Sequence, residues 1–347
     1  MFAKSMAPVI VLAAAARLSG QTITTFDACA AGADQGTSAR SINRSGQVAG
    51  FCVDSNSVAH GFVRDVDGSI TVFDVDGQRT LPSSINKSGQ ITGRFVDSSV
   101  PPMSHGFVRA ADGAIMTFDA PGAVHTYPTG INRYGQIVGG YVDVNQSAHG
   151  FFRDMDGTIT IFDAPGADPS RGTSPMAIRL SGQTTGVYYD LNKVKHGFLR
   201  SRLGKIRKFD APGAGTFAEQ GTVPLSINGK GHVVGVYFDV NQVSHGFVRV
   251  NGTILTIDVP GAGTAAYQGT WAESINGSGQ ITGDFVDASG VSHGFLKQTD
   301  GTITTFDGPG AGTADGQGTF TYSINDFGGV AGQYYDTNGV IHGFVLK

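Results

Sequence analysis

Residues 271–307 read WAESINGSGQITGDFVDASGVSHGFLKQTDGTITTFD and contain four short segments separated by turn residues. The segments 271–276, 280–287, 293–297 and 302–307 are rich in the β-branched and aromatic residues that favour strands. Gly-Ser-Gly at 277–279 and Asp-Gly at 300–301 are typical of tight hairpin turns. The stretch therefore predicts four consecutive antiparallel strands.

The His-Gly-Phe tripeptide of this stretch recurs along the chain at regular intervals. Successive copies are 45, 44, 47, 49, 48 and 49 residues apart. Four-stranded propeller blades repeat about every 40 to 50 residues, and no segment has the apolar periodicity of a helical repeat. The histidines that open the seven copies are His60, His105, His149, His196, His245, His293 and His342.

The two ends of the repeat array complement each other. The array begins at 23–27 with ITTFD, a fourth-strand segment, and stops at 342–347 after a third-strand segment. In a closed ring the N-terminal strand would complete the last blade and remove an exposed edge. We therefore predict an all-β fold, a seven-bladed β-propeller of four-stranded blades over residues 21–347, as one domain. A glycine recurs on every second strand, as at Gly283, and predicts close packing of a neighbouring blade there.

Residues 1–20 have the features of a secretory signal peptide. Lys4 precedes an apolar run at 6–16, and small residues suited to cleavage follow. The run is shorter than the roughly 20 residues that span a bilayer, so we expect a secreted or periplasmic protein that is not inserted in a membrane after cleavage. Export permits a disulfide between Cys29 and Cys52, and the sequence leaves their pairing open.

The low charge of the chain argues against several classes of function. Only 15% of residues are charged, the net charge is −4, and no basic block occurs, so we expect no nucleic-acid partner. Glu219 and Glu273 are the only glutamates, and this scarcity argues against acid/base catalysis. We expect a monomer without a cofactor.

The spaced motifs resemble a known family. The pattern SIN-x-x-GQ-x-x-G followed by His-Gly-Phe, as at 274–283 and 293–295, is similar to the HAF-repeat family of predicted extracellular bacterial repeat proteins. That family has His-Ala-Phe where this chain has His-Gly-Phe, and the similarity covers all seven units. The resemblance implies an exported repeat protein and brings no established activity or catalytic residue.

An aspartate precedes each histidine across a short loop, and most units add a first-strand serine such as Ser274. A Ser-His-Asp triad is one interpretation, but catalysis needs one such set, whereas this set repeats. We interpret the residues as a structural hydrogen-bonded network of the second, third and first strands. Its aspartates are Asp54, Asp97, Asp143, Asp190, Asp239, Asp287 and Asp336.

We expect no metal site. One histidine per blade of a ring lies too far from the others to share an ion at about 2 Å. Asp65-Val66-Asp67-Gly68 begins like a calcium loop, but Ile70 occupies the position that requires glycine. We interpret it as a hairpin turn.

Function in a repeat protein lies where the copies differ. Three residues before the first-strand serine position the copies vary most, and Trp271 is the only tryptophan. The candidate ligand-binding residues on the loop-rich face are Trp271, Tyr127, Phe320, Tyr322, Glu273, Arg40 and Arg171. Packing between blades is the alternative role for these aromatic residues.

We therefore expect an exported, non-catalytic propeller that binds a carbohydrate or protein ligand. Two alternatives stay open. One is a secreted polysaccharide lyase or hydrolase that uses Glu273, Arg171 and His125, and the other is a purely structural surface protein.

Overall fold

A computed structural model describes residues 15–18, 21–31 and 35–347 of the chain. These residues form strands joined by turns and loops, and the described ranges contain no helix. The predicted all-β class is confirmed. Accordingly, no helix of the described residues is long and apolar enough to cross a membrane.

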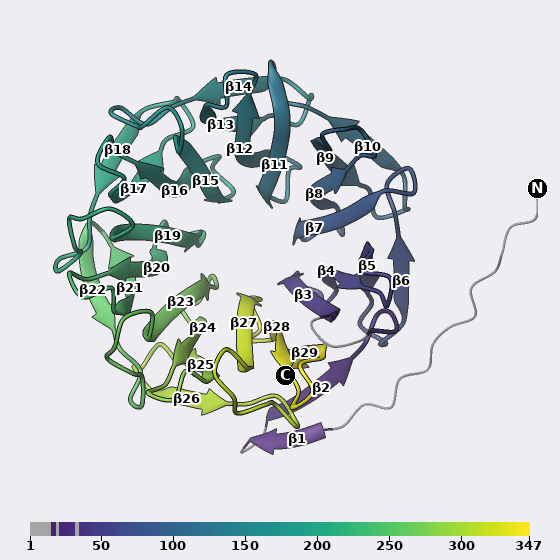
Figure 1. Cartoon of the computed structure of the whole chain (residues 1–347), viewed down its shortest axis with the longest axis vertical. Helices are drawn as coiled ribbons and strands as arrows, with labels where there is room; N and C mark the ends of the chain where they lie inside the picture. The colour runs from purple at the N-terminus through teal and green to yellow at the C-terminus, as the bar shows by residue number, and fades with distance from the viewer. Residues whose placement is uncertain (1–14, 19–20, 32–34) are drawn as a thin grey trace, which may run out of the picture.

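The repeat units stand around a central axis, and each unit contributes one strand to each of four concentric layers (Figure 1). The innermost strands are β3 (Gly36–Ile42), β7 (Arg79–Ile85), β11 (Ala123–Ile131), β15 (Thr173–Ile178), β19 (Gly221–Ile227), β23 (Gly269–Ile275) and β27 (Gly318–Ile324). We number the repeat units one to seven by these strands. The second strands are β4 (Val48–Val53), β8 (Ile91–Val96), β12 (Ile137–Asp143), β16 (Thr184–Tyr189), β20 (Val233–Phe238), β24 (Ile281–Val286) and β28 (Val330–Tyr335).

The third strands begin next to the histidine of His-Gly-Phe. They are β5 (Ala59–Arg64), β9 (Ser104–Arg109), β13 (Ala148–Arg153), β17 (Lys195–Arg200), β21 (Ser244–Val250), β25 (Ser292–Lys297) and β29 (Ile341–Leu346). The outermost strands are β6 (Ile70–Phe73), β10 (Ile115–Phe118), β14 (Ile159–Phe162), β18 (Ile206–Phe209), β22 (Thr253–Ile257), β26 (Ile303–Phe306) and the N-terminal β2 (Gln21–Phe26).

The N-terminal strand β2 lies beside the C-terminal strand β29. The two pair antiparallel, with Ile23 opposite Leu346 and Phe26 opposite Gly343. Beyond β2 lies β1 (Ala15–Leu18), which pairs with it antiparallel. The rest of the signal peptide predicted at 1–20 lies outside the described residues, so its cleavage stays a prediction.

Neighbouring units pack through the apolar side chains of the third strands. The phenylalanine of every His-Gly-Phe has no exposed surface. In six interfaces the outermost strand of one unit presents a phenylalanine edge-to-face to it, as Phe73 does to Phe107 at 6.1 Å between ring centroids. Burying each such side chain contributes about 1.5 to 3 kcal/mol to stability. Because these phenylalanines lie at every interface between units, the hydrophobic core is divided among the interfaces.

A belt of asparagine side chains also joins the units. The asparagine of the Ser-Ile-Asn motif donates from Nδ2 to the backbone carbonyl of the equivalent residue in the next unit, at 2.9–3.2 Å. The donors are Asn43, Asn86, Asn132, Asn228, Asn276 and Asn325. Unit four has Arg179 instead, which donates from Nη1 to the carbonyl of Gly229 at 3.0 Å. Buried amides are thus paired between units rather than within one.

The recurring glycine of the second strand has a different role from the one predicted. A Cβ on Gly283 would lie 1.9 Å from the carbonyl oxygen of Trp271 and 2.7 Å from the ring of Phe295. Both residues belong to the same unit as Gly283, so the prediction that a neighbouring blade packs there was wrong. The glycine instead allows the first and third strands of its own unit to approach the second.

Candidate functional site

Each histidine of His-Gly-Phe lies between two aspartates. Nδ1 is 2.8–2.9 Å from the aspartate that ends the outermost strand of the unit. Nε2 is 3.4–3.8 Å from the second-strand aspartate named from the sequence. The closer partners, which sequence reasoning missed, are Asp27, Asp74, Asp119, Asp163, Asp210, Asp258 and Asp307.

The second-strand aspartates mainly hold their own loops. Oδ1 of Asp54 accepts the backbone N–H groups of Asn56 and Val58, each at 2.9 Å. The bond from Val58 is the largest of the effects that lower the pKa of Asp54. The same loop bonds recur at Asp143, Asp190, Asp239, Asp287 and Asp336. Because these aspartate and histidine contacts recur in the repeat units, we interpret them as structural interactions that stabilise the loops.

The serine of Ser-Ile-Asn is not part of the histidine network. Oγ of Ser41, Ser226, Ser274 and Ser323 accepts the backbone N–H of the isoleucine in the next unit at 3.2–3.4 Å. The expectation of a linked Asp-His-Ser network was therefore wrong. Strand alternation directs this serine to the neighbouring unit, away from the histidine of its own unit.

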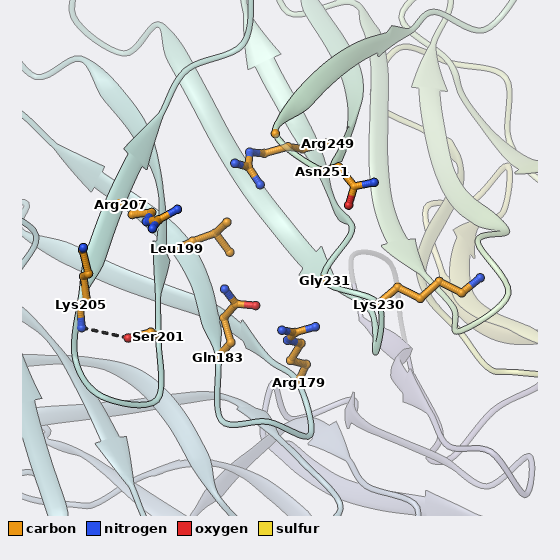
Figure 2. Close-up of a pocket in the computed structure, with 11 residues that line it drawn as sticks. Arg179, Gln183, Leu199, Ser201, Lys205, Arg207, Lys230, Gly231, Arg249 and Asn251 are labelled. Atoms are coloured by element: carbon orange, nitrogen blue, oxygen red, sulfur yellow. Dashed lines mark hydrogen bonds between the residues drawn. The ribbon is translucent and has the colours of Figure 1, made fainter.

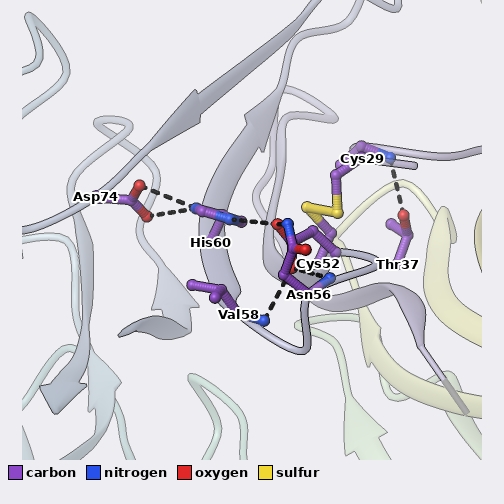
Figure 3. Close-up of a disulfide and its surroundings, with 9 residues drawn as sticks. Cys29, Thr37, Cys52, Asn56, Val58, His60 and Asp74 are labelled. Atoms are coloured by element: carbon purple, nitrogen blue, oxygen red, sulfur yellow. Dashed lines mark hydrogen bonds and ion pairs between the residues drawn. A yellow bond between two sulfur atoms is a disulfide. The ribbon is translucent and has the colours of Figure 1, made fainter. Parts of the chain in front are cut away.

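The residue opposite each histidine packs on the imidazole ring. In six units it is Phe or Tyr, stacked at 4.9–5.1 Å between ring centroids. In unit one it is Cys52, which forms a disulfide with Cys29 beside His60 and Asp74 (Figure 3). Cys29 follows β2 and Cys52 lies on β4, so the disulfide joins the N-terminal segment to unit one.

The Asp-Gly segments form hairpin turns. Oδ1 of Asp67 accepts the backbone N–H of Ser69 at 2.9 Å, and Gly68 has a positive φ of 95°. Within residues 15–18, 21–31 and 35–347 no three His, Cys, Asp or Glu side chains come close enough to share a metal ion.

A β-bulge interrupts the innermost strand of every unit at an equivalent position of the repeat. Bulges redirect a side chain out of the regular alternation. The residues at this position are Arg40, Ser83, Thr129, Met176, Leu225, Glu273 and Tyr322, none of them fully buried. Around the axis they change from charged and aromatic in units six, seven and one to apolar in units four and five.

Units six, seven and one bring Glu273, Tyr322 and Arg40 together, and these are three of the predicted ligand-binding residues. The guanidinium carbon of Arg40 lies 4.1 Å from the centroid of the Tyr322 ring. Burial raises the pKa of Glu273 to about 7, against the lowering effect of Arg40. We call Arg40, Glu273, Tyr322 and the adjacent Asp284 the axial cluster.

Asp284 is the member of the axial cluster that sequence reasoning missed. It lies on β24 opposite Trp271, is 7% exposed, and accepts the backbone N–H of Thr321 at 3.3 Å. Burial and then the charge of Glu273 raise the pKa of Asp284 well above its ordinary value. The available signal was its position directly after the recurring glycine, which varies among the units: Phe51, Arg94, Gly140, Val187, Val236, Asp284 and Gln333.

Three other predicted residues make aromatic or cation–π contacts of their own. Trp271 packs edge-to-face on Phe238 of unit five at 5.5 Å, as expected for packing between units. Phe320 also packs edge-to-face, but on Tyr335 of its own unit, at 5.7 Å. Tyr127 lies beneath the guanidinium of Arg94, 5.3 Å from its carbon.

Arg171 belongs to a different group of contacts. It forms an ion pair with Glu219 and lies 5.2 Å from the ring of Tyr189. Lys195 continues this group, with Nζ 4.6 Å from the centroid of Phe238, the ring that contacts Trp271. His125, named for the enzyme alternative, accepts the backbone N–H of Ser104 through Nδ1 at 3.1 Å. The described contacts of Glu273, Arg171 and His125 are therefore with different residues.

Comparison with known proteins identifies the fold. The chain matches no protein-family model and no curated protein. It is similar in structure to streptogramin B lyase (TM-score 0.58, 15% identity, 94% of this chain and 98% of that one). It is also similar to a catalytically inactive virginiamycin B lyase from Staphylococcus aureus with quinupristin (0.60, 15%, 94% and 99%). A third similar structure is the β-propeller domain of the trilobed protease from Pyrococcus furiosus (0.61, 11%, 89% and 94%). At these identities the similarity extends to the fold alone, and the predicted β-propeller is confirmed.

Proposed function

We propose that residues 21–347 form one closed propeller of seven blades. Three contacts that join the two ends of the chain support closure. β2 pairs with β29, Ile341 forms a parallel bridge with Gly36, and Asn325 donates to the carbonyl of Asn43 at 3.1 Å. The propeller domain of the trilobed protease has an open velcro topology, whereas the N-terminal strand here lies in the sheet of the last unit.

The function that we propose is non-catalytic binding of a carbohydrate next to the axis of the ring, at the bulges of three adjacent innermost strands. The observation that carries it is the axial cluster, which places a carboxyl pair, a guanidinium and a phenol on three adjacent units. Carboxylates and guanidinium groups bind sugar hydroxyls through several hydrogen bonds each, and aromatic rings stack on sugar faces. Tyr322 provides the ring of the cluster, and Trp271 and Phe320 lie on the same innermost strands.

A glycan-array screen of the purified protein tests this proposal. The chain itself supplies conservative replacements from equivalent positions: Arg40→Ser follows Ser83, Glu273→Thr follows Thr129, and Trp271→Leu follows Leu81. We expect the protein to bind a glycan and the Arg40→Ser and Glu273→Thr variants to bind it at least about tenfold more weakly, as loss of a charged hydrogen bond implies. Lys87→Ser, on an exposed turn, is the matched control. Absence of binding to every glycan, or unchanged binding by the variants, would contradict the proposal.

Glu273 also supports acid/base catalysis on a polysaccharide as a second candidate function. A carboxyl with a pKa of about 7 is suited to give and take protons near neutral pH, and Asp284 beside it has a raised pKa as well. Incubation with a polysaccharide panel and analysis for new reducing ends or unsaturated products distinguishes the two candidates. Products that disappear with Glu273→Gln would favour the enzyme, and a bound glycan that stays intact would favour the binding protein.

We propose that the mature protein is a secreted or periplasmic monomer. The signal peptide predicted at 1–20 supports export, and the disulfide between Cys29 and Cys52 is compatible with an oxidising compartment. N-terminal sequencing of the mature protein and light scattering of the purified chain test these two points. A retained N-terminus or a dimeric mass would overturn the corresponding point.

A further inference from the structure

A cleft lies between units four and five, at the end of the ring where turns join the first strand of each unit to the second and the third strand to the fourth. Its walls are the turn after β15, the β17–β18 hairpin, the turn after β19 and the turn after β21, and its volume is about 490 Å³ (Figure 2). Five of the side chains that line it are cationic, and none is acidic. They are Arg179, Lys205, Arg207, Lys230 and Arg249, and we call this site the basic cleft.

The other units show that these cations depart from the repeat pattern. At the position of Arg179 the other units have asparagine, and at the position of Lys230 units one, two, four and six have serine. Lys205 and Arg207 replace Thr158 and Thr160 of unit three, which recur as Thr302 and Thr304 in unit six. Four of the five cations thus occupy positions where other units have neutral residues.

The same interface has lost the acids that the other hairpins carry. In unit three the turn is Asp154-Met155-Asp156-Gly157, and in unit four it is Ser201-Arg202-Leu203-Gly204. Unit five has Asn251 before its turn glycine, Gly252, where units one, two, three and six have aspartate. The cleft therefore combines gained cations with missing carboxylates.

Electrostatics confirms that Arg249 has lost its usual counter-charge. Burial lowers the pKa of Arg64 and Arg153, and the turn aspartate of the same unit partly offsets this by raising it. For Arg249, burial lowers the pKa and the neighbouring charge of Arg207 lowers it further. In the described part of the chain none of the five cations forms an ion pair with a carboxylate. Like charges gathered without counter-ions repel each other, so a bound anion would remove an unfavourable interaction.

We propose that the basic cleft binds a phosphate or sulfate group carried by a small polar molecule. Guanidinium groups bind such tetrahedral oxyanions through paired N–H donors, and Figure 2 shows the side chains of Arg179 and Arg249 on facing sides of the cleft. Nε of Arg179 is buried and has no hydrogen-bond partner, although Nη1 bonds to Gly229. Gln183 and Asn251 line the same cleft and provide neutral donors and acceptors for the rest of the ligand.

Isothermal titration of the full chain with inorganic pyrophosphate, phosphate and sulfate, at constant ionic strength set with chloride, tests this site. The cleft variant Leu203→Asp, Lys205→Thr, Arg207→Thr restores residues found at the same positions of units three and six, which favours retention of the fold. A second variant, Lys230→Ser, changes one exposed turn residue to the serine of other units. The control variant Lys87→Ser, Arg133→Ser removes two cations from turns at the same end of the ring.

We expect pyrophosphate to bind the wild type and the control variant alike, and the triple variant to bind at least about tenfold more weakly, with a smaller loss for Lys230→Ser. The relative affinities for phosphate and sulfate identify which group the cleft prefers. Equal binding by the wild type and the triple variant, or no binding by the wild type above that of chloride, would overturn the proposal. Thermal unfolding of each variant establishes that it is folded. The glycan-array result does not affect this test, because the basic cleft and the axial cluster have no residue in common.

Discussion

Nδ1 of His342 lies 2.8 Å from Oδ1 of Asp27, although 315 positions separate the two residues along the chain. Six other histidines make the same contact with an aspartate of their own repeat unit, only 13 or 14 residues away. The pair therefore reproduces a local contact of the repeat between the N-terminal strand β2 and the C-terminal strand β29.

The pair makes stability depend on pH in a defined direction. The hydrogen bond to Asp27 is the main cause that raises the pKa of His342. Because the pKa of His342 is higher in the folded than in the unfolded protein, the protonated histidine stabilises the fold. This contribution is fully present below the unfolded pKa of about 6.5 and is lost as the pH rises through the folded pKa. We expect Asp27→Asn to lower the free energy of unfolding by about 0.5 to 1.5 kcal/mol at pH 5.5 and by less at pH 9, measured by urea denaturation. The control Asp76→Asn, at an exposed turn, should change the free energy of unfolding by the same small amount at pH 5.5 and at pH 9. A loss of stability in Asp27→Asn that is larger at pH 9 than at pH 5.5 would contradict a stabilising pair of His342 and Asp27.

The disulfide should stabilise the protein measurably. It joins residues 23 positions apart, so its loss costs about 2 to 4 kcal/mol through the freedom that the unfolded chain regains. We expect dithiothreitol to lower the urea midpoint of the wild type to that of the Cys29→Ser, Cys52→Ser double variant. The double variant should not respond to dithiothreitol, and an unchanged wild-type midpoint would show that the bond contributes nothing.

Gly283 and Gly229 provide a matched pair for alanine substitution. A Cβ at position 283 would meet the carbonyl oxygen of Trp271 and the ring of Phe295, whereas nothing lies within 4 Å of one at position 229. We expect Gly283→Ala to cost about 3 kcal/mol or more, since strand backbone would have to shift, and Gly229→Ala to cost less than about 0.5 kcal/mol. Similar unfolding free energies for the two variants would mean that the close approach at Gly283 is absent.

Glu273 should destabilise the protein as it ionises. Its folded pKa of about 7 is above the ordinary value of 4.5, so burial favours the protonated form. Protonated Glu273 does not destabilise the fold below the unfolded pKa of about 4.5, and the protein loses stability as the pH rises from there through 7. Glu273→Gln, which does not titrate, should therefore be about 1 to 3 kcal/mol more stable relative to the wild type at pH 8.5 than at pH 4.5. A difference that does not change with pH would show that the carboxyl is well solvated.

The sequence predicted the fold better than the site. The repeated strands and turns indicated an all-β propeller because each unit has the same four strand segments separated by turn residues. The aspartate nearest each histidine was missed, although the hairpin register that sets Gly61 opposite Phe73 also sets His60 opposite Asp74. The serine was assigned to the wrong network because the sequence does not indicate which unit a first-strand side chain contacts.

The site depends on contacts between units, which single-repeat reasoning does not supply. Glu273, Tyr322 and Arg40 were named because they lie close to the most variable position of the repeat, but only the packing of units six, seven and one brings them together. Asp284 required the register that sets it opposite Trp271. The basic cleft combines residues from 179 to 252, and its charge is visible only when units four and five are placed side by side.

The pairing of β2 with β29 has a consequence for the order in which the molecule can form. A ribosome makes β2 near the start of synthesis and β29 last, and most repeat units can complete their sheets from consecutive residues while synthesis continues. The sheet that contains β2 must wait until residues 341–346 have emerged, so β2 has an unpaired edge during most of translation. A chain that stops before β29 retains that edge, and chaperones or proteases that recognise unpaired strands can distinguish it from the finished protein.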